Sequence, residues 1–160
     1  MKELIRKILK EQMEEDIYKK ISPTDKIHMS HEDKLKFRNI SPQDQPDLWK
    51  PKGLWYSIGT EWIEWISVEM PQWEDEYIYK IKTNDSEILT IGQENEKRFL
   101  EKYGLNELFK VDWSKVAQEW SGIEVLVDPR SLDNMSLWSS WDVASGCIWN
   151  IKGIKGIEKL

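Results

Sequence analysis

Few residues of this chain have the types and spacings that chemistry at an active site requires. His28 and His31 lie three positions apart, but no carboxylate or cysteine stands beside them at a metal-ligand spacing. Cys147, the only cysteine, lies in an apolar stretch with no histidine near it in sequence, which is typical of a buried, inert thiol. Ser145-Gly146 lacks the glycine spacing of a nucleophile elbow, and no Walker or Rossmann phosphate loop occurs. These observations argue against a metal site, a disulfide framework and most ATP-dependent enzymes and dehydrogenases.

The unusual feature of the composition is its ten tryptophans. Tryptophan combines a large apolar ring with one N–H donor, so it packs cores and also lines sites that stack planar groups. We expect most of the ten to pack the core and its rim, and one or two to contact a planar, heterocyclic ligand. They are Trp49, Trp55, Trp62, Trp65, Trp73, Trp113, Trp120, Trp138, Trp141 and Trp149.

Periodicity along the chain predicts short helices mixed with short strands. Residues 2–20 place apolar side chains three and four positions apart, which predicts an amphipathic helix that ends at Ser22-Pro23. Strict alternation over 76–82 predicts a strand. The pattern is typical of an α+β fold, because few helices are long enough for regular parallel crossovers. Further strands are expected over 26–31, 54–57, 87–91, 123–127 and 147–149, and further helices over 60–66, 93–103 and 112–120.

Cap and turn residues set the ends of these elements. Thr60 and Asp112 are expected to cap the helices that follow them. Gly104 is expected to end the preceding helix in a left-handed conformation. Residues 84–86 predict a turn, after which 87–91 returns as the hairpin partner or neighbour of 76–82.

Length and charge indicate one domain over residues 1–160, with an N-terminal helix over 1–21, a core over 22–150 and a flexible tail over 151–160. The 23 basic and 29 acidic residues give a net charge of −6, which argues against a dominant basic footprint for duplex nucleic acid or anionic membrane. No apolar run approaches the roughly 18–20 residues of a membrane-spanning helix, and the N-terminus lacks the apolar core of a secretory signal. A cytoplasmic location is expected.

Two segments resemble motifs of the ADP-ribosyltransferase superfamily. Ile27-His28-Met29-Ser30, followed by Pro51-Lys52-Gly53-Leu54-Trp55-Tyr56-Ser57, is similar to the first two motifs of the branch that contains poly(ADP-ribose) polymerases and RNA 2′-phosphotransferases. There, one strand carries His-x-Ser/Thr, and the next begins Gly-Ile/Leu-aromatic-aromatic-Ser/Ala and leads into a short helix, here 61–66. The resemblance implies an α+β fold with a small split sheet, antiparallel or mixed, and NAD as substrate without a metal.

Residues 27–150 also resemble a group of small phage and bacterial proteins. These proteins share Lys-Pro-x-Gly-Leu-Trp near the middle, which matches 50–55. They end in Trp-Asp-x-Ala-Ser-Gly-Cys-Ile-Trp, which matches 141–149. This second resemblance is the more specific of the two, and it implies little about function.

The first resemblance assigns roles to individual residues. ADP-ribosyl transfer breaks the bond between nicotinamide and ribose through a transition state with positive charge on the sugar. His28 would form a hydrogen bond with a ribose hydroxyl, with Ser30 beside it. Trp55 falls at the position of the aromatic that stacks on nicotinamide, where the polymerases have Tyr. The NAD-binding residues implied in this way are His28, Ser30, Gly53, Trp55, Tyr56 and Ser57.

Two carboxylates compete to complete the catalytic set. Glu124 lies late in the chain on an expected strand, as the third motif of the family requires, and it faces away from Ile123 and Val125 towards solvent or a cleft. Asp142 follows Trp141 and precedes small residues, where partial desolvation would raise its pKa. It is equally suited to forming a turn by accepting from the backbone of Ser145. Glu124 is slightly favoured as the catalytic carboxylate, with His28 and Asp142 as the other candidates.

The resemblance therefore predicts an NAD-dependent ADP-ribosyltransferase, or an enzyme that hydrolyses NAD, of the kind found among toxins and phage-conflict effectors. The acceptor could be RNA, DNA or protein, and an antitoxin is a possible partner. An RNA acceptor would need a local basic stretch. The alternative is a non-catalytic interaction, immunity or inhibitor protein that binds a basic partner through its acidic surface and exposed tryptophans. The available basic residues are Lys50, Lys52, Lys110, Lys115, Lys152, Lys155 and Lys159.

Overall fold

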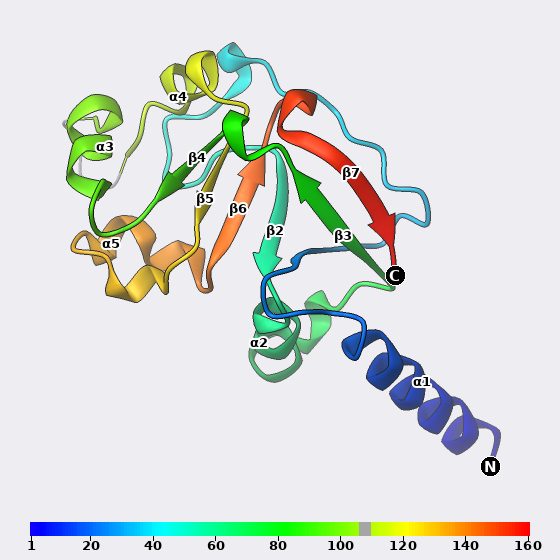
Figure 1. Cartoon of the computed structure of the whole chain (residues 1–160). Helices are drawn as coiled ribbons and strands as arrows, with labels where there is room; N and C mark the ends of the chain where they lie inside the picture. The colour runs from blue at the N-terminus through cyan, green and yellow to red at the C-terminus, as the bar shows by residue number, and fades with distance from the viewer. Residues whose placement is uncertain (106–109) are drawn as a thin grey trace.

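A mixed, curled sheet of seven strands organises the computed structural model, which describes residues 1–105 and 110–160 (Figure 1). The strand order is β4-β5-β6-β2-β1-β3-β7. All neighbouring strands are antiparallel except β4 and β5, which are parallel. The predicted α+β class is confirmed. The strands are β1 Lys26–Ser30, β2 Leu54–Ile58, β3 Tyr77–Thr83, β4 Ile88–Ile91, β5 Gly122–Val125, β6 Ser145–Ile148 and β7 Ile154–Lys159.

The described residues also form five α-helices and several short 3₁₀ turns. α3, α4 and α5 lie around the β4–β5–β6 end of the sheet, α2 follows the end of β2, and α1 projects away from the sheet (Figure 1). None of the described helices is long and apolar enough to cross a membrane. The helices are α1 Lys2–Tyr18, α2 Glu61–Glu69, α3 Glu96–Tyr103, α4 Trp113–Glu119 and α5 Met135–Trp138.

The two faces of the sheet carry separate apolar cores. The larger core lies under α3, α4 and α5, where Trp113, Trp138 and Trp149 are fully buried. The smaller core lies on the opposite face, where Tyr56 and Ile148 pack with their neighbours. This division follows the strand alternation, since Trp55 packs against the larger core and Tyr56 belongs to the smaller one. The prediction that most tryptophans pack the core is confirmed for the three fully buried ones.

β1 and β2 remain side by side for only part of their length. Their register contains two pairs, Lys26 with Ile58 and Ile27 with Ser57. β1 then continues along β3, with Ser30 opposite Tyr77, while β2 continues along β6. From His28 onwards β1 therefore no longer pairs with β2, and the two strands diverge. That opening positions the site described below.

The predicted flexible tail over 151–160 is wrong. After a short turn, β7 pairs with β3 from Tyr79 to Thr83, and Ile154 and Ile157 pack against the smaller core. The C-terminus is thus ordered at a free sheet edge, where a register shift between Lys82 and Thr83 lets two isoleucines three positions apart reach the same core. The pairing expected for 87–91 is also wrong. β3 pairs with β1 and β7, whereas β4 runs parallel to β5.

Cap residues match the sequence predictions in part. Asp112 caps α4 by accepting from the Lys115 amide at 3.0 Å. Thr60 precedes α2, but its hydroxyl donates to the Glu64 carboxylate at 2.9 Å and accepts no hydrogen bond from a backbone N–H of the helix, as a cap would. Gly104 ends α3 in an extended conformation with φ −64° and ψ 138°, so the left-handed prediction is wrong. Glycine is required there because a Cβ would overlap the Leu100 carbonyl.

Candidate functional site

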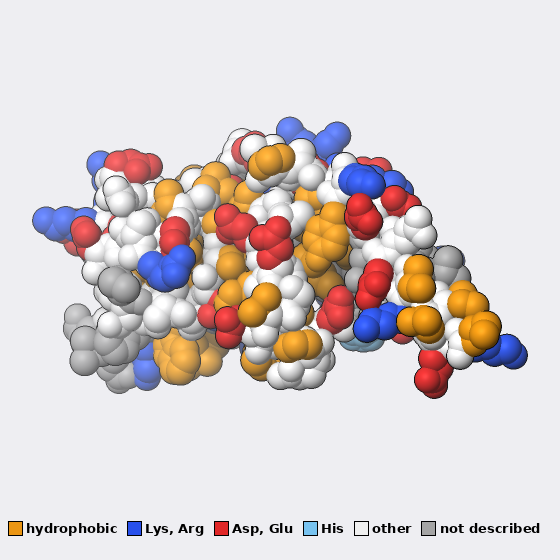
Figure 2. Space-filling view, turned by 90° about the horizontal axis from the view of Figure 1, so that it is seen from below, with side chains coloured by type: hydrophobic (Ala, Val, Ile, Leu, Met, Phe, Trp, Pro, Cys, Tyr) orange, Lys and Arg blue, Asp and Glu red, His pale blue; other side chains and the backbone are white. Residues whose placement is uncertain are grey.

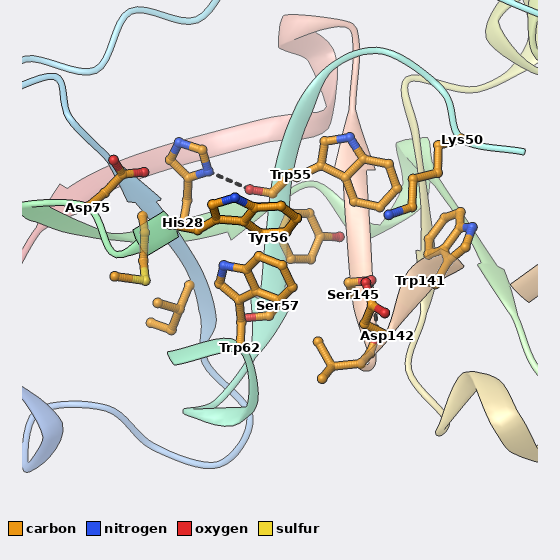
Figure 3. Close-up of a pocket in the computed structure, with 14 residues that line it drawn as sticks. His28, Lys50, Trp55, Tyr56, Ser57, Trp62, Asp75, Trp141, Asp142 and Ser145 are labelled. Atoms are coloured by element: carbon orange, nitrogen blue, oxygen red, sulfur yellow. Dashed lines mark hydrogen bonds between the residues drawn. The ribbon is translucent and has the colours of Figure 1, made fainter. Parts of the chain in front are cut away.

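A cavity of about 310 Å³ opens where β1 and β2 separate, between α2 on one side and the turn that precedes β6 on the other (Figure 3). Its walls come from segments far apart in the chain. They are Ile27, His28, Met29, Lys50, Trp55, Tyr56, Ser57, Trp62, Trp73, Asp75, Trp141, Asp142, Val143 and Ser145. Five of the residues predicted from sequence therefore meet here, namely His28, Trp55, Tyr56, Ser57 and Asp142.

His28 replaces the missing strand contact with a side-chain hydrogen bond. Its Nδ1 lies 2.5 Å from the carbonyl oxygen of Trp55 (Figure 3). A carbonyl only accepts, so Nδ1 carries the proton and donates. Burial lowers the pKa of His28 below its ordinary value, and this hydrogen bond opposes the shift only in part. The neutral ring then keeps Nε2 as a hydrogen-bond acceptor for a ligand.

Four tryptophans line the cavity. Trp55 and Trp141 meet edge to face, with ring centroids 4.9 Å apart. The Lys50 ammonium lies over Trp55, 5.5 Å from the ring centroid. Trp62 and Trp73 approach from α2 and the turn after it. These flat apolar surfaces suit a planar ring, as expected for one or two of the tryptophans.

Asp142 occupies a strained backbone position at the edge of the cavity. Its φ of 55° and ψ of −56° form a γ-turn in which the Val143 amide donates to the Trp141 carbonyl at 2.5 Å. Such a conformation costs about 1–3 kcal/mol for a residue other than glycine. Partial burial raises the pKa of Asp142, and the positive charge of Lys50 opposes that shift. Within the described residues, no hydrogen-bond donor contacts its carboxylate, and the expected bond from Ser145 is absent.

Ser57 contributes a buried polar atom with no partner. The residue is 3% exposed, and its Oγ forms no hydrogen bond with any residue in the described ranges. Leaving a buried hydroxyl unpaired costs about 1–3 kcal/mol. Because Ser57 also lines the cavity, a ligand polar group there would remove that cost.

Glu124, the carboxylate favoured from the sequence to act together with His28 and Trp55, lies outside this cavity. All four residues of β5 are buried, so its side chain faces the smaller core and not a cleft. It accepts from the Tyr56 hydroxyl at 2.5 Å and forms an ion pair with Lys26. Gly146 makes this contact possible, because a Cβ there would overlap the Tyr56 ring. Burial and the adjacent Glu124 carboxylate raise the pKa of Tyr56 well above its ordinary value.

A second cavity, of about 380 Å³, adjoins the first and shares His28, Met29 and Asp75 with it. Ser30 and Gly53, which the resemblance places at the NAD site, line this second cavity. The Ser30 hydroxyl accepts from the Glu32 amide at 3.0 Å. A Cβ at Gly53 would overlap the Ile148 carbonyl, so glycine is required by close packing of β2 on β6. The second cavity also contains the basic residues His31, Lys36 and Arg38.

Sequence reasoning missed several cavity residues. Trp62, Trp73 and Asp75 come from the segment between β2 and β3, whose role depends on tertiary folding. Lys50 lies inside the Lys-Pro-x-Gly-Leu-Trp motif, so the motif itself could have indicated it. Trp141 could have been inferred in the same way from its position before Asp142. Cys147 is fully buried, and burial raises the pKa of its thiol well above its ordinary value, as expected for an inert cysteine.

Comparison of the chain with protein-family models, curated proteins and solved structures gave no match. Among the described residues, no group of three or more His, Cys, Asp or Glu side chains is placed to hold a metal ion. Function is therefore inferred from the geometry of the two cavities together with the sequence motifs.

Proposed function

We propose that the two cavities bind NAD and that the protein transfers its ADP-ribose to a macromolecular acceptor. The observation that carries this proposal is the Asp142 carboxylate, held on a strained turn at the edge of an aromatic cavity. Strained backbone is retained where it serves a function, and carboxylates with raised pKa values gather at catalytic sites. The nicotinamide ring of NAD is planar and positively charged. Indole faces and carboxylates both favour such a ring.

The adjoining cavities suit the two ends of a dinucleotide. The first offers Trp55 and the Ser57 hydroxyl to the nicotinamide ring and its carboxamide. The second offers Lys36 and Arg38 to the diphosphate. His28 lines both cavities, and its Nε2 is available to accept from a ribose hydroxyl. The separation of β1 from β2 also supports the split-sheet, ADP-ribosyltransferase-like fold that the motifs imply.

Asp142 is the carboxylate assigned to the reaction. The bond from the ribose C1′ to the nicotinamide nitrogen breaks, and its electron pair remains on nicotinamide, which leaves as a neutral molecule. The negative charge of Asp142 stabilises the positive charge that develops on the sugar. A lone pair of the acceptor atom forms the new bond to C1′, and the acceptor proton passes to Asp142. With water in place of the acceptor, the same step hydrolyses NAD.

Substitution of Ser57 tests ligand binding without disturbing the fold. Ser57→Ala removes a buried hydroxyl that has no partner, so stability should remain equal or increase. Affinity for NAD, measured by quenching of tryptophan fluorescence, should fall about tenfold, in line with the loss of one hydrogen bond. Ser86→Ala, a change in an exposed turn outside both cavities, is the matched control. Absence of saturable NAD binding, or equal binding by both variants, would overturn the proposal.

A further inference from the structure

All the charged residues in the segment from Gly53 to Tyr79 are acidic. The segment contains no Lys, Arg or His, while five glutamates and one aspartate fall within α2 and the turn that follows. The same segment holds four of the ten tryptophans. The acidic residues are Glu61, Glu64, Glu69, Glu74, Asp75 and Glu76, and all except Asp75 are exposed. We call the surface formed by 61–76 the α2 face.

A row of three indoles crosses the α2 face and reaches the first cavity. Trp62 and Trp65 stack with ring centroids 5.1 Å apart and planes 11° apart, and Trp65 lies 6.4 Å from Trp73. Trp62 and Trp73 both line the cavity, and Trp73 is 51% exposed. Figure 2 views the molecule from this side and shows carboxylate side chains among hydrophobic ones in the middle of the face, with most Lys and Arg towards its edges.

The chemistry of the α2 face selects a cationic partner. Exposed tryptophans stack on guanidinium groups, and nearby carboxylates pair with them. A nucleic acid would place its phosphates against several glutamates, which is repulsive. The nearest lysine after the segment, Lys80, already pairs with Asp25 at 3.1 Å. The row of indoles also ends at the cavity in which the Ser57 hydroxyl lies buried without a partner.

We propose that the α2 face binds an arginine-rich segment of a protein and presents it at the mouth of the cavity. The identification of that protein as the ADP-ribose acceptor rests on the function proposed above, whereas the binding itself does not. Guanidinium groups would stack on Trp73 and Trp65 and pair with the surrounding glutamates. A protein acceptor is thereby favoured over RNA or DNA.

Binding of defined peptides tests this proposal in the absence of NAD. A fluorescein-labelled peptide of alternating Arg and Gly is titrated with the full chain, with a Glu-Gly peptide and single-stranded RNA of the same length as comparisons. We expect saturable binding of the arginine peptide alone, weakened by salt. Trp73→Ala, and separately the triple variant Glu61→Gln, Glu64→Gln and Glu69→Gln, should each weaken it about tenfold.

A variant with the same change in net charge provides the control. Glu94→Gln, Glu101→Gln and Glu158→Gln alter exposed residues outside the α2 face and should leave binding nearly unchanged. Equal weakening by the two triple variants, or preferential binding of RNA, would overturn the proposal. Nicotinamide release measured separately distinguishes the two hypotheses. Peptide binding without NAD cleavage would support the proposed binding surface and contradict the proposed enzymatic activity. NAD cleavage without peptide binding would contradict the binding surface alone.

Discussion

Glu124 and Asp142, the two carboxylates weighed as catalytic groups, have opposite surroundings. Glu124 lies on regular strand backbone, is 3% exposed, and contacts Tyr56 and Lys26. Asp142 lies on a strained turn at the cavity, and Lys50 is the cation that acts on it through space. A buried carboxylate with full partners stabilises the fold, whereas a carboxylate held under strain beside a cavity is available for chemistry.

The Lys26 side chain extends the structural network around Glu124. Its ammonium donates to the Thr83 hydroxyl at 2.5 Å and lies 3.4 Å from Asp85, and Thr83 in turn donates to Asp85 at 2.7 Å. The network therefore connects β1, β3 and β5 beneath the smaller core. Tyr56 connects the two regions, since the residue lines the cavity while its hydroxyl is fixed by Glu124 on the other side of the sheet.

Removing Glu124 should have the largest effect on stability. Glu124→Ala leaves the Lys26 ammonium and the Tyr56 hydroxyl buried without their carboxylate partner, which should cost about 3 kcal/mol. Urea unfolding followed by circular dichroism measures the loss. Asp142→Ala is the matched comparison and should not be destabilised. Equal destabilisation of the two variants would remove the distinction between the carboxylates.

Gly146→Ala should have the next largest effect. The added Cβ meets the Tyr56 ring and must displace it, which should cost about 2 kcal/mol. The displacement also separates the Tyr56 hydroxyl from Glu124, so the near-ultraviolet circular dichroism of the aromatic residues should change. An unaltered spectrum and unfolding midpoint would show that Tyr56 does not lie across Gly146.

Relief of strain at Asp142 should have a smaller effect of opposite sign. Asp142→Gly removes the side chain from a positive φ, and we expect a gain in stability of about 1 kcal/mol. Nicotinamide release should be lost in the same variant. A loss of stability would indicate that the Asp142 side chain supports the fold, as Glu124 does.

The pH dependence of stability should show the smallest effect. Burial raises the pKa of Asp142 in the folded state above its ordinary value of 3.8, so ionisation costs more in the folded chain than in the unfolded one. Wild-type stability should therefore fall, relative to Asp142→Asn, as the pH rises from below 3.8 through the raised pKa. Unfolding midpoints of the two proteins between pH 3 and 6 measure this difference. Wild-type stability that stays level or rises relative to Asp142→Asn over this range would contradict the raised pKa.

The sequence predicted the local elements and part of the site. Alternation located β3, but β7 was missed. Three of the predicted site residues, His28, Trp55 and Asp142, do line one cavity, whereas the favoured carboxylate, Glu124, does not. Alternation also assigned Glu124 to the face opposite Ile123, but it carries no information about what covers that face, here Tyr56 crossing Gly146. The pairings of β4 and β7 could not be predicted because they depend on long-range register. The sequence of 61–76 shows that this segment is rich in acidic residues and tryptophan, but it does not show that the segment lies beside the cavity.

Nicotinamide release from NAD by a pair of isosteric variants tests the central claim most directly. We predict that Asp142→Asn lowers turnover by about 100-fold or more, as expected for loss of a catalytic carboxylate, with no loss of stability. Glu124→Gln should retain turnover within a few fold at a temperature where it remains folded. Full activity in Asp142→Asn together with inactivity of folded Glu124→Gln would contradict the claim and return the catalytic role to Glu124.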